Sequence, residues 1–231
     1  MNIAVILAGG TGTRMGGNEP KQFLSLGGRA VVEHSVSLFD SHPAIDEIAV
    51  VVHPDYLEQM QQTVKRNHWH KVTRLLCGGA ERYLSSLSAI EAYAPHPDAN
   101  LLFHDAARPL VDGNMVSRVV EALADCNAVT VAIDSADTIA VADETGQHLS
   151  AIPDRRTLRR VQTPQAFKQH TIAEAYALAL RDPHFAATDD CGTVLRYLPD
   201  EPIRLVEGSA RNIKITYPED LLTAEQLLKV Q

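Results

Sequence analysis

The segment VILAGGTGTRMGGNEPKQF, residues 5–23, combines five glycines with Arg14 and Lys21. A short apolar run leads into these glycines, as when a buried strand enters a phosphate-binding loop. Loop N–H groups and two fixed cations suit a triphosphate whose α-phosphate is attacked, because charge builds on its oxygens in the transition state. Arg14 can bridge two oxygens, while Lys21 supplies a compact charge. The alternative is a structural glycine turn with a solvated arginine and lysine.

Two other kinds of phosphate loop do not match this segment. A Walker A loop requires Gly-Lys-Ser/Thr, whereas Lys21 lies in the tripeptide Pro-Lys-Gln. A dinucleotide loop requires G-x-G-x-x-G at the start of a helix, but the spacing from Gly10 to Gly16 is one residue too long. Pro20 also prevents a regular helix from continuing through the loop. The spacing therefore argues against a hydride-transfer enzyme.

The hexapeptide HDAARP, residues 104–109, places a carboxylate at the end of a predicted strand. Ligands of open α/β sheets bind at this edge, and Mg²⁺ binds a few carboxylates together with phosphate oxygens. Asp105 is thus a candidate magnesium ligand, and a structural ion pair between Asp105 and Arg108 is the alternative. We expect His104 to pack or cap rather than catalyse, because no nearby nucleophile needs activation.

Two further segments each allow two interpretations. In GGAERYLSS, residues 78–86, the glycines let backbone approach a base or sugar, and Ser85 can hydrogen-bond a base. Equally, Ser85 or Ser86 can cap the following helix. Lys214 interrupts an apolar strand, where alternation by itself points its side chain to solvent. No Ser-His-Asp or Cys-His arrangement stands out, so we expect catalysis by positioning and electrostatics.

Apolar runs and helical patterns alternate along most of the chain. The predicted strands cover residues 3–8, 45–53, 71–77, 100–105, 127–133 and 203–216. The predicted helices cover residues 30–42, 55–67, 85–94, 113–126, 170–182, 189–198 and 218–230. This rhythm predicts an α/β fold with three layers, in which a mostly parallel Rossmann-like sheet has helices on both faces.

The rhythm changes after Asp134. The stretch TIAVADETGQHLSAIPD alternates around a Glu-Thr-Gly turn, which predicts a projecting β-hairpin arm over about residues 138–160. Its apolar residues would be exposed on an isolated arm, so we expect a homodimer in which a second arm buries them. No repeat or linker interrupts the sequence, so residues 1–231 are expected to form a single domain.

Composition restricts the class of protein. The 231 residues carry a net charge of -8, which argues against broad nucleic-acid binding. Three scattered cysteines indicate neither a disulfide framework nor a zinc site. The N-terminal apolar run is too short for a signal peptide or a membrane span. We therefore expect a cytoplasmic protein with no membrane partner.

Taken together, the segments resemble the 2-C-methyl-D-erythritol 4-phosphate cytidylyltransferases and the related ribitol-5-phosphate cytidylyltransferases. The resemblance spans the chain through AGGTGTRMGGNEPKQF, GGAERYLSS, HDAARP, DTI, VQTPQAF, TDD and NIKITYPEDL. It implies Mg²⁺-dependent transfer of CMP from CTP to a sugar-alcohol phosphate, with release of pyrophosphate. It also implies a homodimer in which the arm completes the partner's site.

The resemblance assigns roles by position. The catalytic cations would be Arg14, Lys21 and Lys214. The nucleotide would be bound by Ala8, Gly9, Gly10, Thr11, Gly12, Gly79, Ser85 and Ala106. The acceptor would be bound by Asp105, Arg108, Thr138, Arg155, Thr163 and Thr188. Asp105 would also bind Mg²⁺, and Lys214 would contact the α-phosphate rather than solvent.

The acceptor is expected to be 2-C-methyl-D-erythritol 4-phosphate, because HDAARP has the form found in those enzymes. Two departures keep ribitol 5-phosphate or another pentitol phosphate as an alternative: the first loop reads Ala-Gly-Gly, and DTIAV lacks a lysine after its isoleucine. A non-catalytic nucleotide-binding protein is a further alternative. The presence of all three candidate cations argues against it.

Overall fold

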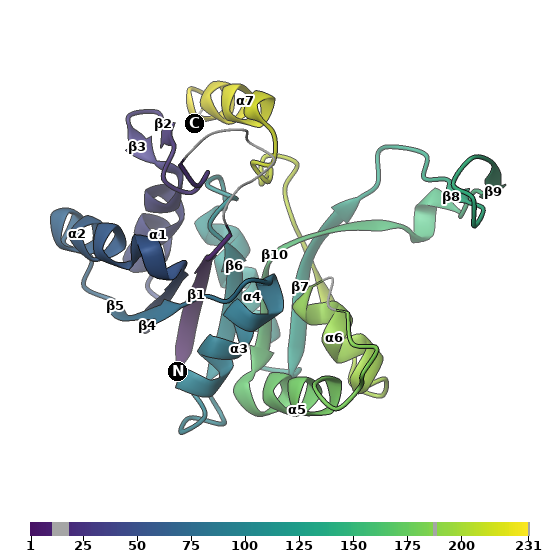
Figure 1. Cartoon of the computed structure of the whole chain (residues 1–231), viewed down its shortest axis with the longest axis horizontal. Coiled ribbons are helices and arrows are strands. Elements are labelled where there is room, and N and C mark those ends of the chain that lie inside the picture. Colours follow the sequence, from purple (N-terminus) through teal and green to yellow (C-terminus); the bar gives the residue numbers. More distant parts are fainter. Residues whose placement is uncertain (11–18, 187–188, 231) are drawn as a thin grey trace.

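The computed structural model describes residues 1–10, 19–186 and 189–230, and every structural statement below refers to these. A seven-stranded sheet forms the centre of the molecule in the order β11-β7-β10-β6-β1-β4-β5 (Figure 1). Its strands are β1 (Asn2–Ala8), β4 (Glu47–Val52), β5 (Val72–Cys77), β6 (Asn100–Asp105), β7 (Ala128–Asp134), β10 (Arg159–Lys168) and β11 (Ile203–Glu207). The six strands other than β10 run parallel, which confirms the predicted α/β sheet.

Helices cover both faces of the sheet. They are α1 (Val31–Ser41), α2 (Leu57–Asn67), α3 (Arg82–Ala92), α4 (Gly113–Ala122), α5 (Gln169–Ala179), α6 (Asp190–Tyr197) and α7 (Pro218–Leu228), with 3-10 turns η2 (Pro54–Tyr56) and η3 (Arg155–Thr157). Alternate residues of β1 enter two different cores: Ile6 packs with α1, α2 and α4, while Val5 packs with α3, α5 and α6. Burial on both faces explains why the strand is a continuous apolar run.

Strand β10 was not among the predicted strands. It runs antiparallel between β6 and β7, and its pairing register shifts between Val161 and Gln165, around Pro164. Proline has no N–H to donate to a ladder, so in a sequence it argues against a central strand. Here the irregular register accommodates it, and Ala166 and Phe167 beyond it are fully buried.

The predicted strand over residues 203–216 is wrong in its second half. Strand β11 ends at Glu207, and residues 208–217 form an irregular segment before α7. That segment is tied to the core by the amide of Ile215, which donates to the carbonyl of Ala107 at 2.8 Å. Lys214 therefore lies in an irregular segment that is hydrogen-bonded to the residues just after β6. Because this segment is not a strand, the alternation of side chains along a strand does not determine where Lys214 points.

The predicted hairpin arm is confirmed. It consists of β8 (Val141–Ala142) and β9 (Leu149–Ala151), and it projects from the extended ends of β7 and β10 (Figure 1). Leu149 and Ile152 are 63% and 57% exposed, so the arm buries little apolar surface within its own chain.

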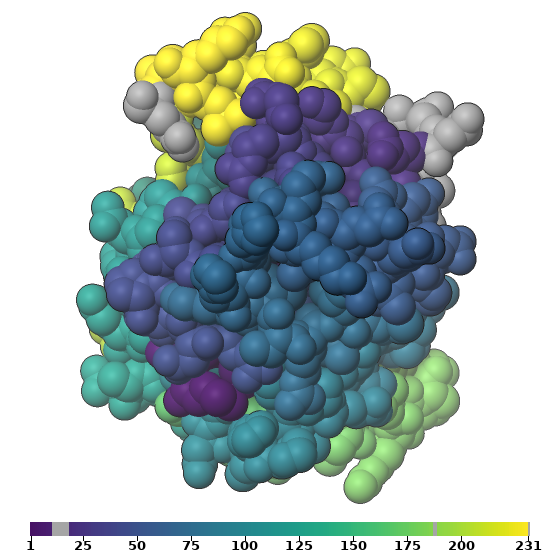
Figure 2. Space-filling model, turned by 90° about the vertical axis from the view of Figure 1, so that its left-hand side faces the viewer, coloured from purple at the N-terminus to yellow at the C-terminus, as the bar shows by residue number. Residues whose placement is uncertain are grey.

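Helix α7 lies beside a small two-stranded sheet, β2 (Ser25–Leu26) and β3 (Arg29–Ala30). A separate apolar cluster, which includes Leu26, Ile215 and Ala224, joins them. Figure 2 shows α7 lying across the upper end of the N-terminal half of the chain. Within the described ranges, no helix is long and apolar enough to cross a membrane.

Candidate active site

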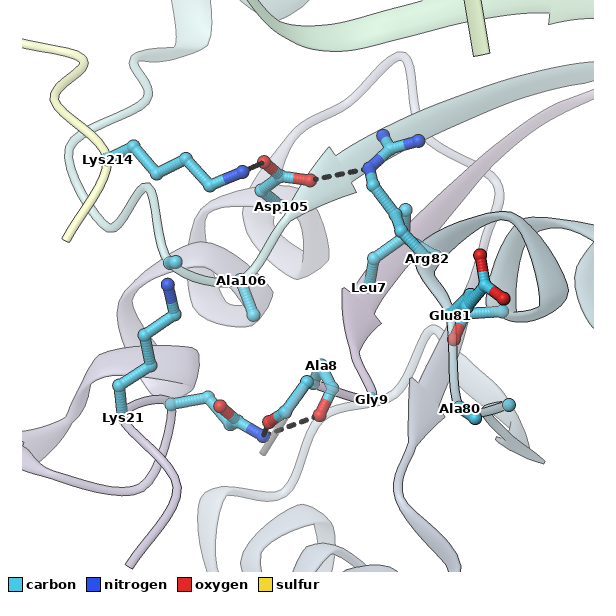
Figure 3. A pocket seen from close by; sticks show the side chains of 15 residues that line it. Leu7, Ala8, Gly9, Lys21, Ala80, Glu81, Arg82, Asp105, Ala106 and Lys214 are labelled. Atoms are coloured by element: carbon cyan, nitrogen blue, oxygen red, sulfur yellow. Dashed lines mark hydrogen bonds and ion pairs between the residues drawn. The ribbon is translucent and has the colours of Figure 1, made fainter. Parts of the chain in front are cut away.

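A pocket of about 270 Å³ lies at the carboxyl ends of β1 and β6, facing the start of α3 (Figure 3). We call it the glycine-lined pocket. It is lined by Leu7, Ala8, Gly9, Gly10, Lys21, Gln22, Gly79, Ala80, Glu81, Arg82, Ser85, Asp105, Ala106, Ala107 and Lys214. The fold thus brings together predicted residues from four distant segments, at the edge where open α/β sheets bind ligands.

Asp105 stands at the centre of the charges in this pocket. Its carboxylate lies 2.6 Å from the ammonium of Lys214 and 3.4 Å from Nε of Arg82 (Figure 3). Burial by itself raises the pKa of this carboxyl, but Arg82 and Lys214 outweigh it and hold the pKa well below its usual range. Asp105 is therefore ionised at neutral pH and fixes one cation on each side.

Arg82 is a site residue that the sequence interpretation missed. Its Nη1 donates to Oδ2 of the fully buried Asp190 at 2.7 Å, and Tyr176 donates its hydroxyl to Oδ1 of Asp190 at the same distance. Although burial disfavours the charge, Asp190 and Asp105 raise the pKa of Arg82 above its ordinary value. A permanently charged guanidinium is thus held at the pocket wall by two carboxylates from different elements.

Lys21 reaches the same pocket from the other end of the chain. Its ammonium donates to the carbonyl of Ile215 at 2.8 Å, next to Lys214. The side-chain amide of Gln22 donates to the carbonyls of Ala8 and Gly10, at 2.6 and 2.8 Å. These bonds join the residues after the first loop to the end of β1. Two of the three predicted catalytic cations therefore line one pocket.

The glycines of this pocket allow close approach between two backbone segments. A Cβ on Gly9 would lie 2.9 Å from the hydroxyl oxygen of Ser85, and one on Gly78 would lie 2.8 Å from it. A Cβ on Gly79 would meet Leu84 at 2.3 Å. A Cβ atom does not fit at these distances, so these positions accept only glycine, whose side chain is a hydrogen atom.

The capping alternative for Ser85 and Ser86 is wrong. Helix α3 begins at Arg82 with Glu81 at its N-cap position, so both serines lie inside the helix. The buried Ser85 lines the pocket, where its predicted contact with the base remains a prediction. Ala106 also lines it and donates its amide to the carbonyl of Leu7 at 3.0 Å.

Arg108 does not form the predicted alternative pair with Asp105. Its Nη1 donates to the carbonyl of Asn212 at 2.7 Å instead. The hydroxyl of Thr163 accepts from the backbone amide of Asp105 at 3.1 Å. His104 is fully buried beside these residues, and burial lowers its pKa to about 4. A neutral, enclosed imidazole agrees with the expected packing role.

Among the described residues, Thr138 and Arg155 are not brought to the pocket by this chain. Thr138 and Arg155 belong to the exposed arm, and Nη1 of Arg155 donates only to the carbonyl of Ala136, at 3.1 Å. Figure 1 shows the arm directed away from the sheet edge that carries the pocket. The predicted residues Thr11, Gly12, Arg14 and Thr188 lie outside the described residues.

The donor set of the pocket fits magnesium only in part. No three histidine, cysteine, aspartate or glutamate side chains gather as a metal site in the described part of the chain. A carboxylate has about four lone-pair positions, and the two cations beside Asp105 leave some of them available. One carboxylate plus substrate phosphate oxygens is a usual arrangement for Mg²⁺.

Comparisons with known proteins identify the family of this chain. The family profile of 2-C-methyl-D-erythritol 4-phosphate cytidylyltransferase matches residues 2–230. The enzyme of that name from Thermobifida fusca is 46% identical over 98% of this chain and 92% of its own length. A bifunctional ribulose 5-phosphate reductase/CDP-ribitol pyrophosphorylase from Haemophilus influenzae is 40% identical over 99% of this chain, which spans 48% of that protein.

Solved structures give the same result. The 4-diphosphocytidyl-2C-methyl-D-erythritol synthase of Anaerococcus prevotii superposes with a TM-score of 0.86, at 29% identity, over 99% of this chain and 98% of that one. The 2-C-methyl-D-erythritol 4-phosphate cytidylyltransferase of Thermus thermophilus has a TM-score of 0.77 at 32% identity, over 99% of this chain and all of that one. The chain belongs to the 2-C-methyl-D-erythritol 4-phosphate cytidylyltransferase family.

Proposed function

We propose that this protein transfers CMP from CTP to 2-C-methyl-D-erythritol 4-phosphate, giving CDP-methylerythritol and pyrophosphate for isoprenoid precursor synthesis in the cytoplasm. The observation that carries the proposal is the convergence of Lys21, Lys214, Arg82 and Asp105 in one glycine-lined pocket. Three cations and backbone-lined walls are what a nucleoside triphosphate requires.

In the proposed reaction a phosphate oxygen of the acceptor attacks the α-phosphorus of CTP. The bond from that phosphorus to the bridging oxygen breaks, and pyrophosphate leaves with the electron pair. Lys21 and Lys214 stabilise the charge that develops on the α-phosphate oxygens, together with Arg14 of the first loop. Asp105 holds the ammonium of Lys214 in place before substrate arrives. The catalytic effect is electrostatic and positional, and no covalent enzyme intermediate is needed.

Magnesium belongs to this proposal. Asp105 would hold it together with oxygens of the triphosphate, and the ion would neutralise phosphate charge. Asp105→Asn should therefore raise the Mg²⁺ concentration needed for half-maximal activity while the protein stays folded. Circular dichroism checks the fold, and Asp98→Asn on the exposed surface is the control. An unchanged magnesium titration would contradict the assignment.

The choice of acceptor rests on the sequence identity of this chain to its relatives. The methylerythritol enzyme from Thermobifida fusca is 46% identical, against 40% for the protein named for CDP-ribitol. The decisive experiment measures pyrophosphate release from CTP with 2-C-methyl-D-erythritol 4-phosphate, ribitol 5-phosphate and other pentitol phosphates in turn. The highest kcat/KM should be found with the methylerythritol compound. A higher value with ribitol 5-phosphate would establish the alternative acceptor.

The proposed assembly is a homodimer that pairs the arms. Val141, Leu149 and Ile152 are exposed apolar residues on the arm, and a two-fold partner would cover them. In that arrangement Thr138 and Arg155 of one chain would bind the acceptor in the site of the other. Arg155 then gains an anionic partner that it lacks among the described residues of its own chain.

A further inference from the structure

A second cavity of about 270 Å³ lies on the other side of Lys214 from the glycine-lined pocket. It is lined by Arg108, Arg160, Val161, Gln162, Ala210, Asn212, Ile213 and Lys214. Three of these side chains are cationic and none is a carboxylate. The cavity therefore offers a concentrated positive charge that its own walls do not neutralise.

Arg160, at the start of β10, has no ion pair or side-chain hydrogen bond within the described parts of the chain. Its neighbour Arg159 differs, since that guanidinium pairs with Asp134 at 3.1 Å and lines a separate cavity beside β11. Two adjacent arginines on one strand thus face different surroundings. Only the one that lines the second cavity lacks an anionic partner.

Arg108 is also incompletely bonded. Nη1 donates to the carbonyl of Asn212, whereas Nε is buried and has no hydrogen-bond partner. Burial lowers the pKa of Arg108; Asp105 opposes this effect, while the positive charges of Arg82 and, to a smaller extent, Arg160 add to it. The repulsion between Arg160 and the half-buried Arg108 costs free energy. An anion bound between the two guanidinium groups would offset this cost.

The walls of the second cavity are held in place by buried amides. Asn212 is fully buried, and its side chain donates to the carbonyl of Thr163 at 2.9 Å. Gln162 donates to the carbonyl of Ser209 at 2.8 Å. These bonds join β10 to the segment that carries Lys214. The cations are thus presented by two segments that are tied to each other.

We propose that Arg160 is a further binding residue for the phosphate monoester of the acceptor, acting with Arg108 and Lys214 of the same chain. This inference rests on the proposed function, in which the acceptor phosphate must lie beside the α-phosphate of CTP. Lys214 lines both cavities, so an anion in the second cavity adjoins the one in the glycine-lined pocket. The glycines that suit a nucleotide line only the first of these two cavities.

The test compares Arg160→Ala with Arg160→Lys, and with Arg159→Ala as the matched control on the same strand. For Arg160→Ala we expect the KM of the acceptor to rise roughly 10- to 100-fold, as for loss of a hydrogen bond to a charged group. The KM of CTP should stay within about twofold, and Arg160→Lys should recover part of the loss. An unchanged acceptor KM, or an equal rise in Arg159→Ala, would overturn the proposal.

Inorganic phosphate provides a probe that does not depend on which polyol the enzyme uses. Its binding to the CTP-loaded protein, measured by titration calorimetry, should be weaker in Arg160→Ala and unchanged in Arg159→Ala. Equal phosphate binding by wild type and Arg160→Ala would overturn the assignment. A raised KM for CTP alone would show that the cavity takes the triphosphate tail, which also overturns it. If no polyol phosphate reacts, the proposed function fails while the phosphate titration still decides the role of Arg160.

Discussion

The glycine-lined pocket and the arm both present arginine, but they hold it differently. Arg82 lies between Asp190 and Asp105, and Asp190 is fully buried. Arg155 on the arm makes a single hydrogen bond, to a backbone carbonyl, and is exposed. The pocket side chain is fixed by carboxylates from two other elements of the same chain, β6 and α6. Within the described part of the chain, no carboxylate holds the arm side chain in this way.

The pocket is therefore assembled within one chain, whereas the arm is left exposed by its own chain. The pocket has its cations, its ionised carboxylate and its close backbone contacts in place without a partner. The arm is a two-stranded ribbon with exposed apolar residues, and isolated ribbons of that size are marginally stable in water. We therefore expect changes in the pocket to act within one chain, and changes in the arm to act across two.

The largest effect is expected from Asp190→Asn. Removing this buried charge leaves Arg82 with Asp105 as its remaining anionic partner, and loss of one member of a buried pair costs about 3 to 5 kcal/mol. Urea unfolding should show the loss in the free energy of unfolding, and CTP binding should weaken as well. Asp200→Asn on the surface is the control. If both variants unfold at the same urea concentration, the pocket is not held together in the way described.

A somewhat smaller effect is expected from Lys21→Ala. Its ammonium lines the pocket where charge develops only during attack, so turnover should fall by about 2.7 to 4 kcal/mol in barrier height, with a lesser effect on CTP binding. Steady-state kinetics at saturating CTP and acceptor give kcat directly. Lys65→Ala on the exposed face of α2 should behave as wild type. Near-normal turnover in the Lys21 variant would remove it from the catalytic group.

Mixing two inactive variants tests the arm. Lys21→Ala chains and Arg155→Ala chains should together recover about a quarter of wild-type activity after random exchange, because half of the dimers then contain one intact site of two. Sedimentation confirms the dimer, and differently tagged chains confirm exchange. Exchange without recovery, or a monomer at assay concentration, would show that the arm does not complete a partner's site.

The smallest effect concerns the turn at the end of the arm. The carboxylate of Asp143 accepts from Thr145, Gln147 and His148, and the hydrogen bond from Thr145 does most to lower its pKa. Because this pKa is lowered, the ionised carboxylate of Asp143 stabilises the turn at neutral pH. That stabilisation is lost as the pH falls through the pKa and the carboxylate becomes protonated. Amide exchange at residues 145–148 should be faster in Asp143→Ala than in wild type at pH 6, and the two should converge toward pH 3. The unfolding temperature should be the same in both proteins at pH 6.

The parallel part of the fold was predictable because its strands are short apolar runs, and the central strands β1, β4 and β6 are buried by helices on both sides. Strand β10 was missed because its pairing is a tertiary property: its own sequence contains a proline and three charged residues, and only the neighbours β6 and β7 make it central. The predicted end of the last strand was wrong for a related reason. The apolar residues near Lys214 pack with α7 and the Leu26 cluster instead of continuing a ladder.

Within the site, sequence analysis identified the residues whose type and position at a strand end already indicate chemistry, such as Asp105 and Lys21. It missed Arg82 because an arginine at the start of a helix is ordinary, and its significance comes from Asp190, which is 108 positions away in the chain. The second cavity was missed for the same reason. Arg108 and Arg160 are neighbours only in the folded protein.

The link between Lys21 and the carbonyl of Ile215 joins the beginning of the chain to a segment close to its end. During synthesis the ribosome releases the first loop and β1 long before it releases Lys214. A nascent chain that stops earlier leaves Asp105 with Arg82 but without its closest cation. The glycine-lined pocket is thus completed by a segment translated long after β1 and β6, so a product truncated before Lys214 would lack the charge arrangement on which the proposed transfer depends.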